Sequence, residues 1–236
     1  LLAISRKHDL AVIEDCAHVS GSTYKGLPLG GFGDAAFFSS QWSKPYTTGL
    51  GGLAVTSDER IAKRLRITSE QFTDPPRNQV IRLRAQYELY RRFFSPRLYW
   101  QAVGILERMS RWNLFVGSSR ESELAAAEPI DKEWRMSAFQ ASVGSGQMNG
   151  LQENAAHRRA LAEFYEDYLS GHGWELPRTP GHSECAFLRY PVRVSNKAEL
   201  LQKAEHSRVE LGSWFESVLH PIHDALERFG YSEGQC

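Results

Sequence analysis

Two side chains capable of covalent and acid–base chemistry follow short apolar segments of this chain. Asp15 ends the segment LAVIED, and Lys44 lies shortly after AAFFSS, within the run SSQWSKPYTTGLGG (39–52). An acid and a lysine framed by hydroxyl and glycine residues suit one cofactor in particular, pyridoxal phosphate (PLP). The amine forms a Schiff base with its aldehyde, the carboxylate pairs with its pyridine nitrogen, and hydroxyl and N–H groups take its phosphate. A surface loop with one charge is the plainer alternative.

The segments around these two side chains are typical of an α/β fold. Residues 10–15, 35–40 and 51–57 each predict a buried strand, and the glycine-rich run 22–34 predicts a hairpin or tight loop. A helix is expected from residue 59, after an N-cap at one of the two preceding residues. Because ligands bind where strand ends, loops and helix N-termini converge in an open α/β sheet, Asp15 and Lys44 should meet at one site.

The second half of the chain predicts further helices and one more strand. Residues 117–129 are typical of a linker, and a long helical segment begins at Ser137 with a weak point at Gly150. CAFLRYPVRV (185–194) predicts a strand, and a helix follows from Asn196, whose spacing from Glu199 is that of a capping box.

A segment rich in arginine and aromatic residues, 77–116, predicts two helices that meet near Pro96. We favour an amphipathic packing helix with a solvated arginine face. Contact with a membrane surface, packing on a dimer or covering the mouth of the site are the alternatives.

Composition excludes several classes of protein. The 28 basic and 28 acidic residues balance, so nucleic acid is not an expected partner. The three cysteines are widely separated and lack metal-ligand spacing, so neither a disulfide framework nor a metal site is expected, and a reducing, cytoplasmic location is favoured. No apolar run is long enough to span a bilayer. The two ends, Leu1 and Cys236, indicate a fragment of a larger protein that lacks both ends and is inactive by itself.

In combination, the motifs resemble the core of the DegT/DnrJ/EryC1/StrS sugar aminotransferase family, within the fold-type I PLP enzymes. That family carries an acid, an Ala-Ala-Gln or Ala-Ala-His tripeptide, a G-x-x-G-D turn, a serine-to-lysine element and a T-x-G-x-G-G strand. The corresponding places here read Asp15, CAH (16–18), GGFGD (30–34), SSQWSK (39–44) and TTGLGG (47–52). RMSAFQASVGSGQM also resembles the family's helix before its small domain. The resemblance covers most of the chain except the arginine-rich segment.

The resemblance implies a role for each matching residue. Lys44 would form the Schiff base and then move the proton, and Asp15 would hold the pyridinium nitrogen. His18 would lie by the 3-hydroxyl or ring of PLP, and Ser39 would bind its phosphate. The alternatives are an exposed loop lysine, a helix N-cap, a core histidine satisfied by a backbone group, and a serine that merely ends a strand.

Four further residues are candidates for contact with substrate. Gln41 and Trp42 depart from the family's usual residues beside the lysine, and Trp214 and His220 lie in a segment that resembles its substrate loop. Core packing for Trp214 and a loop cap for His220 are equally good interpretations.

The fold implied is a three-layer α/β/α large domain with a smaller α+β C-terminal domain, both partial. We expect residues 1–76 in the large domain, 77–130 as a helical insertion, and 131–236 as a connecting helix and an incomplete small domain. The activity implied is transfer of an amino group, from glutamate, to a nucleotide-linked keto-sugar in polysaccharide or natural-product biosynthesis, by a homodimer. A non-catalytic sugar-nucleotide-binding relative and an aminotransferase for a non-sugar cyclic ketone are the alternatives.

Overall fold

A computed structural model describes most of the chain. The described residues are 1–95, 97–111, 133–213, 217–219, 222, 226–232 and 234. They fall into two compact units: the described parts of 1–118 and 130–192 form the first, and that of 193–236 belongs to the second. The domain boundaries expected from the sequence stay predictions.

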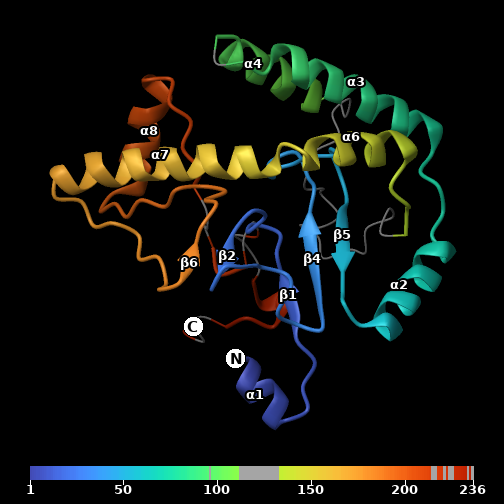
Figure 1. The fold of residues 1–236 in the computed structure, drawn as a ribbon. Coiled ribbons are helices and arrows are strands. Elements are labelled where there is room, and N and C mark those ends of the chain that lie inside the picture. Colours follow the sequence, from blue (N-terminus) through green and yellow to red (C-terminus); the bar gives the residue numbers. More distant parts are fainter. Residues whose placement is uncertain are drawn as a thin grey trace. The chain divides into compact units, whose positions relative to one another are not determined.

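The first unit is built around a three-stranded sheet of order β1-β4-β5. Its strands are β1 (Ile13–Asp15), β4 (Ala35–Ser39) and β5 (Gly52–Val55). β1 pairs with β4 in parallel, whereas β4 and β5 are antiparallel (Figure 1). The three predicted strands are confirmed, with shorter bounds, but their predicted burial is wrong for β1 and β5, where Ile13, Leu53 and Val55 are exposed. These are the two edge strands of the sheet, so their side chains are covered less than those of β4. The chain leaves the end of β4 directly into the loop that carries Lys44.

A second small sheet contains the predicted hairpin. β2 (Thr23–Tyr24) pairs antiparallel with both β3 (Leu27–Pro28) and β6 (Ser183–Glu184). The hairpin turn has positive φ at both central residues, Lys25 (51°) and Gly26 (76°), as tight two-residue turns require.

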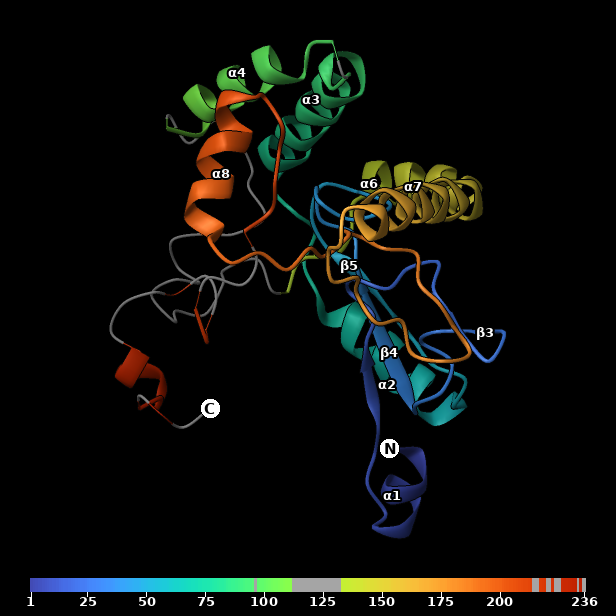
Figure 2. The same cartoon turned by 90° about the vertical axis from the view of Figure 1, so that its left-hand side faces the viewer.

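Helices supply the rest of the structure. They are α1 (Leu2–Lys7), α2 (Glu59–Gln71), α3 (Arg77–Phe93), α4 (Tyr99–Arg111), α6 (Ala138–Met148), α7 (Leu151–Gly171), α8 (Lys197–His206) and a 3-10 turn (Leu226–Phe229). Of these, α8 and the 3-10 turn belong to the second unit. Figure 2 shows α6 and α7 end-on. No helix among the described residues is long and apolar enough to cross a membrane.

The long helical segment is interrupted where the sequence predicted. α6 ends at Met148 and α7 begins at Leu151, next to Gly150. At the start of α6, Ser137 and Gln140 form a capping box in which each side chain accepts the other's backbone N–H. The box orients the first turn of α6, from which Gln140 reaches the lysine-bearing loop.

The strand predicted over 185–194 is wrong. Strand pairing in this region is confined to β6, and the chain then turns at Phe187, whose φ of 44° no β-strand adopts. Two backbone carbonyls accept hydrogen bonds from a side chain and not from a neighbouring strand: Nη1 of Arg158 donates to the carbonyls of Phe187 (3.3 Å) and Leu188 (3.1 Å). A long-range side-chain contact thus replaces the ladder that apolar periodicity predicts.

The glycine-rich turn after β3 is held by Glu14 of β1, which is partly buried. The carboxylate of Glu14 accepts backbone N–H groups from Gly30 (3.0 Å), Phe32 (2.7 Å) and Gly33 (2.7 Å). Partial burial alone would raise the pKa of Glu14, but these three hydrogen bonds outweigh it and the pKa lies below its ordinary value. Glu14 therefore has a structural role.

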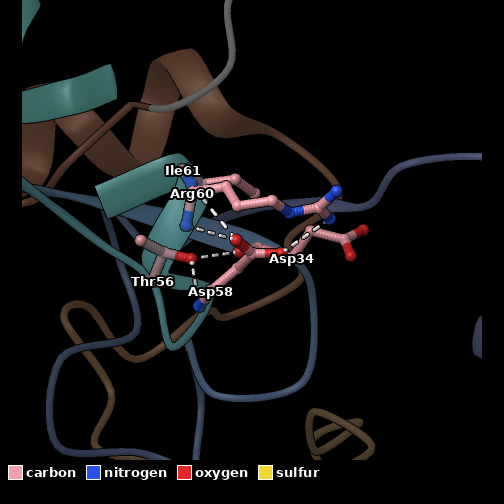
Figure 3. Close-up of polar contacts among 5 residues, drawn as sticks. All are labelled: Asp34, Thr56, Asp58, Arg60 and Ile61. Atoms are coloured by element: carbon pink, nitrogen blue, oxygen red, sulfur yellow. Dashed lines mark hydrogen bonds and ion pairs between the residues drawn. The ribbon is translucent and has the colours of Figure 1, made fainter. Parts of the chain in front are cut away.

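A second network of hydrogen bonds lies at the end of the sheet where β4 begins and β5 ends. Oγ1 of Thr56 donates to the carbonyl of Asp34 (2.6 Å) and accepts the backbone N–H of Asp58 (3.1 Å), as Figure 3 shows. Asp58 in turn caps α2, since its carboxylate accepts the N–H groups of Arg60 (2.7 Å) and Ile61 (3.2 Å). The predicted cap of this helix is confirmed at Asp58.

Candidate active site

Lys44 lies at the tip of the loop between β4 and β5. The loop begins as a closed turn: the N–H of Lys44 donates to the carbonyl of Gln41 (3.0 Å), and a β-bridge joins Gln41 to Gly49. At its base Ser40 is fully buried, and its hydroxyl shares a 2.7 Å hydrogen bond with the hydroxyl of Thr48. These contacts fix the loop as a compact structure.

Two glutamines of α6 anchor this loop from about a hundred residues away in the sequence. Gln147 makes a paired contact with the backbone of Thr47, accepting its N–H (2.9 Å) and donating to its carbonyl (2.7 Å). Gln140 donates to the carbonyls of Thr48 (3.3 Å) and Leu50 (3.0 Å). The return limb of the loop is therefore held by neutral amides.

Trp42 packs against the arginine-rich helix α3. Its ring lies 5.8 Å from that of Tyr90, and a methyl group on Gly49 would come within 3.0 Å of Trp42 and 3.1 Å of the buried Leu83. Gly49 also has a φ of +86°, so both its conformation and its surroundings favour glycine. The described part of the arginine-rich segment thus packs on the lysine loop through α3. Contact of this segment with a membrane surface stays an untested alternative.

Asp15 and Ser39 share one face of the sheet. In the parallel register Asp15 lies opposite Phe37, and Ser39 follows two residues later on the same side. Oδ1 of Asp15 accepts the backbone N–H of Ala17 (3.0 Å), and Oγ of Ser39 accepts that of Gln41 (3.5 Å). Strand alternation sends the neighbouring acid Glu14 to the opposite face, where it holds the glycine turn.

Four charged or titratable groups act on one another at this place. Burial lowers the pKa of Lys44; the carboxylate of Asp15 opposes the shift and the guanidinium of Arg189 adds to it. Burial also lowers the pKa of His18, reinforced by the charge of Lys44, opposed by Asp15 and assisted by Arg189. A lowered pKa increases the fraction of Lys44 in the neutral, nucleophilic form.

Two buried hydroxyl groups near these residues have no hydrogen-bond partner among the described residues. Tyr46, two residues after Lys44, is 4% exposed, and Ser20, two residues after His18, is 3% exposed. Unsatisfied buried hydroxyls are uncommon in native proteins and call for a partner. An amine, a carboxylate, an imidazole and orphan hydroxyls together fit the donors and acceptors of PLP.

The structure brings together the predicted residues Asp15, His18 and Lys44, with Ser39 on the same sheet face as Asp15. Trp214 and His220 lie outside the described residues. Among the described residues no cluster of three or more His, Cys, Asp or Glu side chains is placed to hold a metal ion.

Sequence reasoning missed three residues of this region. Arg189 was hidden in a segment taken for a strand, and Gln140 and Gln147 in a segment taken simply as helix. The spacing of the two glutamines, seven residues or two helical turns apart, places them on one face of α6 and is the signal that points to a shared contact.

Comparison with known proteins identifies the family. The family model for DegT/DnrJ/EryC1/StrS aminotransferases matches residues 1–236. The chain belongs to this family. The resemblance predicted from the motifs is therefore confirmed, and the family is PLP-dependent.

Several curated proteins are similar to this chain. The spore coat polysaccharide biosynthesis protein SpsC of Bacillus subtilis is 42% identical and aligns with 99% of this chain and 52% of its own length. L-glutamine:scyllo-inosose aminotransferase of Streptomyces griseus is 30% identical (95% and 46%). GDP-perosamine synthase of Caulobacter vibrioides is 26% identical (94% and 48%). The chain thus spans about half the length of the curated relatives it matches.

A solved structure agrees in fold. A DegT DnrJ EryC1 StrS aminotransferase from Brucella abortus superimposes with a TM-score of 0.65 at 18% identity, covering 98% of this chain and 48% of that one. The mixed α/β architecture is therefore that of family aminotransferases over about half of their chains.

Proposed function

We propose that the full-length protein containing this chain is a PLP-dependent aminotransferase in which Lys44 carries the cofactor. One observation supports this above all others. The loop between β4 and β5 holds a half-buried lysine, of lowered pKa, within electrostatic reach of the strand-end carboxylate of Asp15. A solvated loop lysine would be neither half-buried nor influenced by the charge of a nearby carboxylate.

Each residue then has a chemical task. PLP, when bound, supplies an electron sink for the bond at the substrate's α carbon. Lys44 holds the cofactor's aldehyde carbon and afterwards accepts and returns a proton at its amine. Asp15 keeps the cofactor's ring nitrogen protonated, His18 lies by its ring or 3-hydroxyl, and Ser39 binds its phosphate. The orphan hydroxyls of Tyr46 and Ser20 are available as further donors.

For the substrate, we infer a nucleotide-linked keto-sugar, with glutamate as the amino donor, in polysaccharide or natural-product biosynthesis. Support comes from the relatives named for spore coat polysaccharide and for GDP-perosamine. Gln41, Trp42, Trp214 and His220 are the proposed substrate contacts. The finer fold assignment also belongs to this proposal: a fold-type I large domain, a partial small domain and a homodimer, in the cytoplasm.

A second candidate is amination of a non-sugar cyclic ketone. The relative named for scyllo-inosose, at 30% identity, favours it specifically, and its name gives glutamine as the donor. A non-catalytic sugar-nucleotide-binding relative is the third, and the presence of both Asp15 and Lys44 is the evidence against it.

Borohydride trapping of the full-length protein tests the proposal. After the visible spectrum is recorded, reduction and peptide mass spectrometry should locate a pyridoxyl group on Lys44. Lys44→Ala should remove both the visible band and turnover while leaving the melting temperature of the cofactor-free protein near its original value. Lys63→Ala, on α2, serves as the matched control. A folded full-length protein that binds no PLP would disprove the proposal.

Substrate class is tested separately. Amino transfer is measured with glutamate and with glutamine as donors, against a GDP- or UDP-linked 4-keto-sugar and against scyllo-inosose. Turnover with a nucleotide-linked sugar alone supports the first candidate, and turnover with scyllo-inosose alone replaces it with the second.

A further inference from the structure

Asn154 and Arg158, on one face of α7, link the loop that carries Lys44 to the segment that carries Arg189. Nε of Arg158 donates to Oδ1 of Asn154, one helical turn earlier, at 2.7 Å. Nδ2 of Asn154 donates, at the long distance of 3.5 Å, to the carbonyl of Pro45, the residue after Lys44. The helix therefore contacts the lysine loop directly beside the reactive side chain.

The same arginine holds the segment that carries Arg189. Nη1 of Arg158 bonds the carbonyls of Phe187 and Leu188, so its planar guanidinium contacts Asn154 with one edge and this segment with the other. Leu188 immediately precedes Arg189. Hydrogen bonds from a charged donor are stronger than neutral ones, which suits a contact that must fix backbone outside regular secondary structure.

Independent contacts keep the segment folded at its other end. The N–H of Ala186 donates to Oγ of Ser22 at 2.9 Å. A methyl group on Gly21 would approach the Cβ atoms of Ala155 and Ala186 to 2.9 and 3.6 Å, so this junction is closely packed. Loss of Arg158 should therefore release residues 187–189 without unfolding the unit.

We propose that Arg158 is a positioning residue: together with Asn154 it joins the loop of Lys44 to the segment 187–189, and so fixes the backbone from which Arg189 extends. The inference deepens the proposed function and rests on it for its catalytic consequence. The charges that act on Lys44 come from Asp15 and Arg189, and His18 faces the same group. Arg158 thus acts on the lysine through Arg189.

The test measures the ionisation of the Lys44 amine in the full-length protein freed of cofactor. Competitive acetylation with acetic anhydride across pH, read by peptide mass spectrometry, gives the titration midpoint of Lys44. Burial is the main cause that lowers the pKa of Lys44, and the Arg189 charge adds to it. Arg158→Met, which frees the segment of Arg189, should therefore move this midpoint upward. Arg159→Met, the next position on the helix, is the matched control and should leave it in place, and Lys63 serves as the internal reference.

A double-mutant cycle decides whether the effect passes through Arg189. In an Arg189→Met background, Arg158→Met should cause no further shift of the Lys44 midpoint. An equal shift in both backgrounds, or an unshifted midpoint in a single variant that retains its melting temperature, overturns the proposal. If Arg158→Met does not fold, Arg158→Lys is measured in the same way. It keeps the charge but not the planar fork, and a smaller upward shift is expected.

The holoenzyme gives the catalytic readout. In the loaded protein Arg158→Met should lower kcat/KM by roughly 10- to 100-fold, the cost of a small misplacement of catalytic groups. If the protein binds no PLP, the proposed function fails while the acetylation cycle still tests the positioning role. If PLP binds and the cycle shows no coupling, the positioning role alone fails.

Discussion

The glycine turn at 30–34 and the lysine loop at 39–52 follow one another in the sequence and are held by opposite means. Carboxylates hold the turn: Glu14 accepts three of its backbone N–H groups, and Oδ2 of Asp34 accepts that of Val12 at 2.7 Å. Neutral amides hold the loop, since Gln140 and Gln147 bond its backbone.

The difference follows from what each segment must do. A carboxylate is a strong acceptor for clustered N–H groups, which suits the three that Glu14 binds in the turn. In the lysine loop a structural charge would compete with Asp15 for the lysine amine. Holding that loop with amides adds no further charge to those that act on Lys44, whose pKa is lowered mainly by burial, raised by Asp15 and lowered by Arg189.

The strongest test of this difference removes the charge of each of the two adjacent acids, Asp15 and Glu14, in turn. Asp15→Asn should reduce turnover about 100-fold or more, because the ring nitrogen of PLP loses its ionic partner, while stability changes little. Glu14→Gln should do the reverse and lower stability with turnover of the folded fraction retained. Steady-state kinetics and thermal melts of both variants make the measurement. Equal losses of turnover would contradict the division of roles.

Truncation of Glu14 should give the largest loss of stability. Glu14→Ala leaves three partly buried N–H groups without their acceptor, which costs about 2–4 kcal/mol in free energy of unfolding. Glu14→Gln keeps one acceptor oxygen and should lose about half as much. Urea denaturation followed by circular dichroism measures both, and a Gln variant less stable than the Ala variant would refute the assignment.

The same residue predicts a pH dependence. Because the pKa of Glu14 is lower in the folded state, its contribution to stability is full above the ordinary carboxyl pKa of about 4.3 and is lost as the pH falls through the folded value. Melting temperatures between pH 6 and 3 should therefore fall less steeply for Glu14→Gln than for the unmodified protein. Parallel curves would show that Glu14 does not contribute.

For the lysine loop, a substitution of Gln147 should lower stability by a smaller amount, and this loss should not depend on pH. Gln147→Ala removes two hydrogen bonds to the backbone of Thr47 and should cost about 1–2 kcal/mol in stability. Gln147→Glu keeps the acceptor but faces the carbonyl of Thr47 with a second oxygen, so it should be no better than alanine near pH 7. Recovery of stability by the glutamate variant at that pH would mean that neutrality is not required.

Cys16 directly follows the two acids in the sequence, and its reactivity should show the smallest effect. Burial, with the charges of Glu14 and Asp15, raises the pKa of its thiol to about 11, so at pH 8 only about one thiol in a thousand is ionised. In a Cys236→Ser background, Cys185 should react with iodoacetamide long before Cys16, as peptide mass spectrometry would show. Glu14→Gln should increase the rate at Cys16. An unchanged rate would place Glu14 too far away to act.

Sequence alone determined the local parts of this protein. The strands around Asp15 and Lys44, the break near Gly150 and the cap at Asp58 depend on neighbouring residues, whose periodicity and turn chemistry can be seen directly. The acid-to-lysine interval and the motifs around it also identified the family correctly. These features are encoded within stretches of a few tens of residues.

Tertiary structure decided what depends on contacts between distant residues. The segment 185–194 has the apolar pattern of a strand, yet Arg158 takes the carbonyls of Phe187 and Leu188 and the ladder does not continue. The hydrogen bonds of Gln140 and Gln147 to the lysine loop also join residues that are far apart in the sequence. The effect of the Arg189 charge on Lys44 does so too. Periodicity records which side chains prefer burial, whereas the choice of partner depends on which segments the folded chain brings within hydrogen-bonding distance.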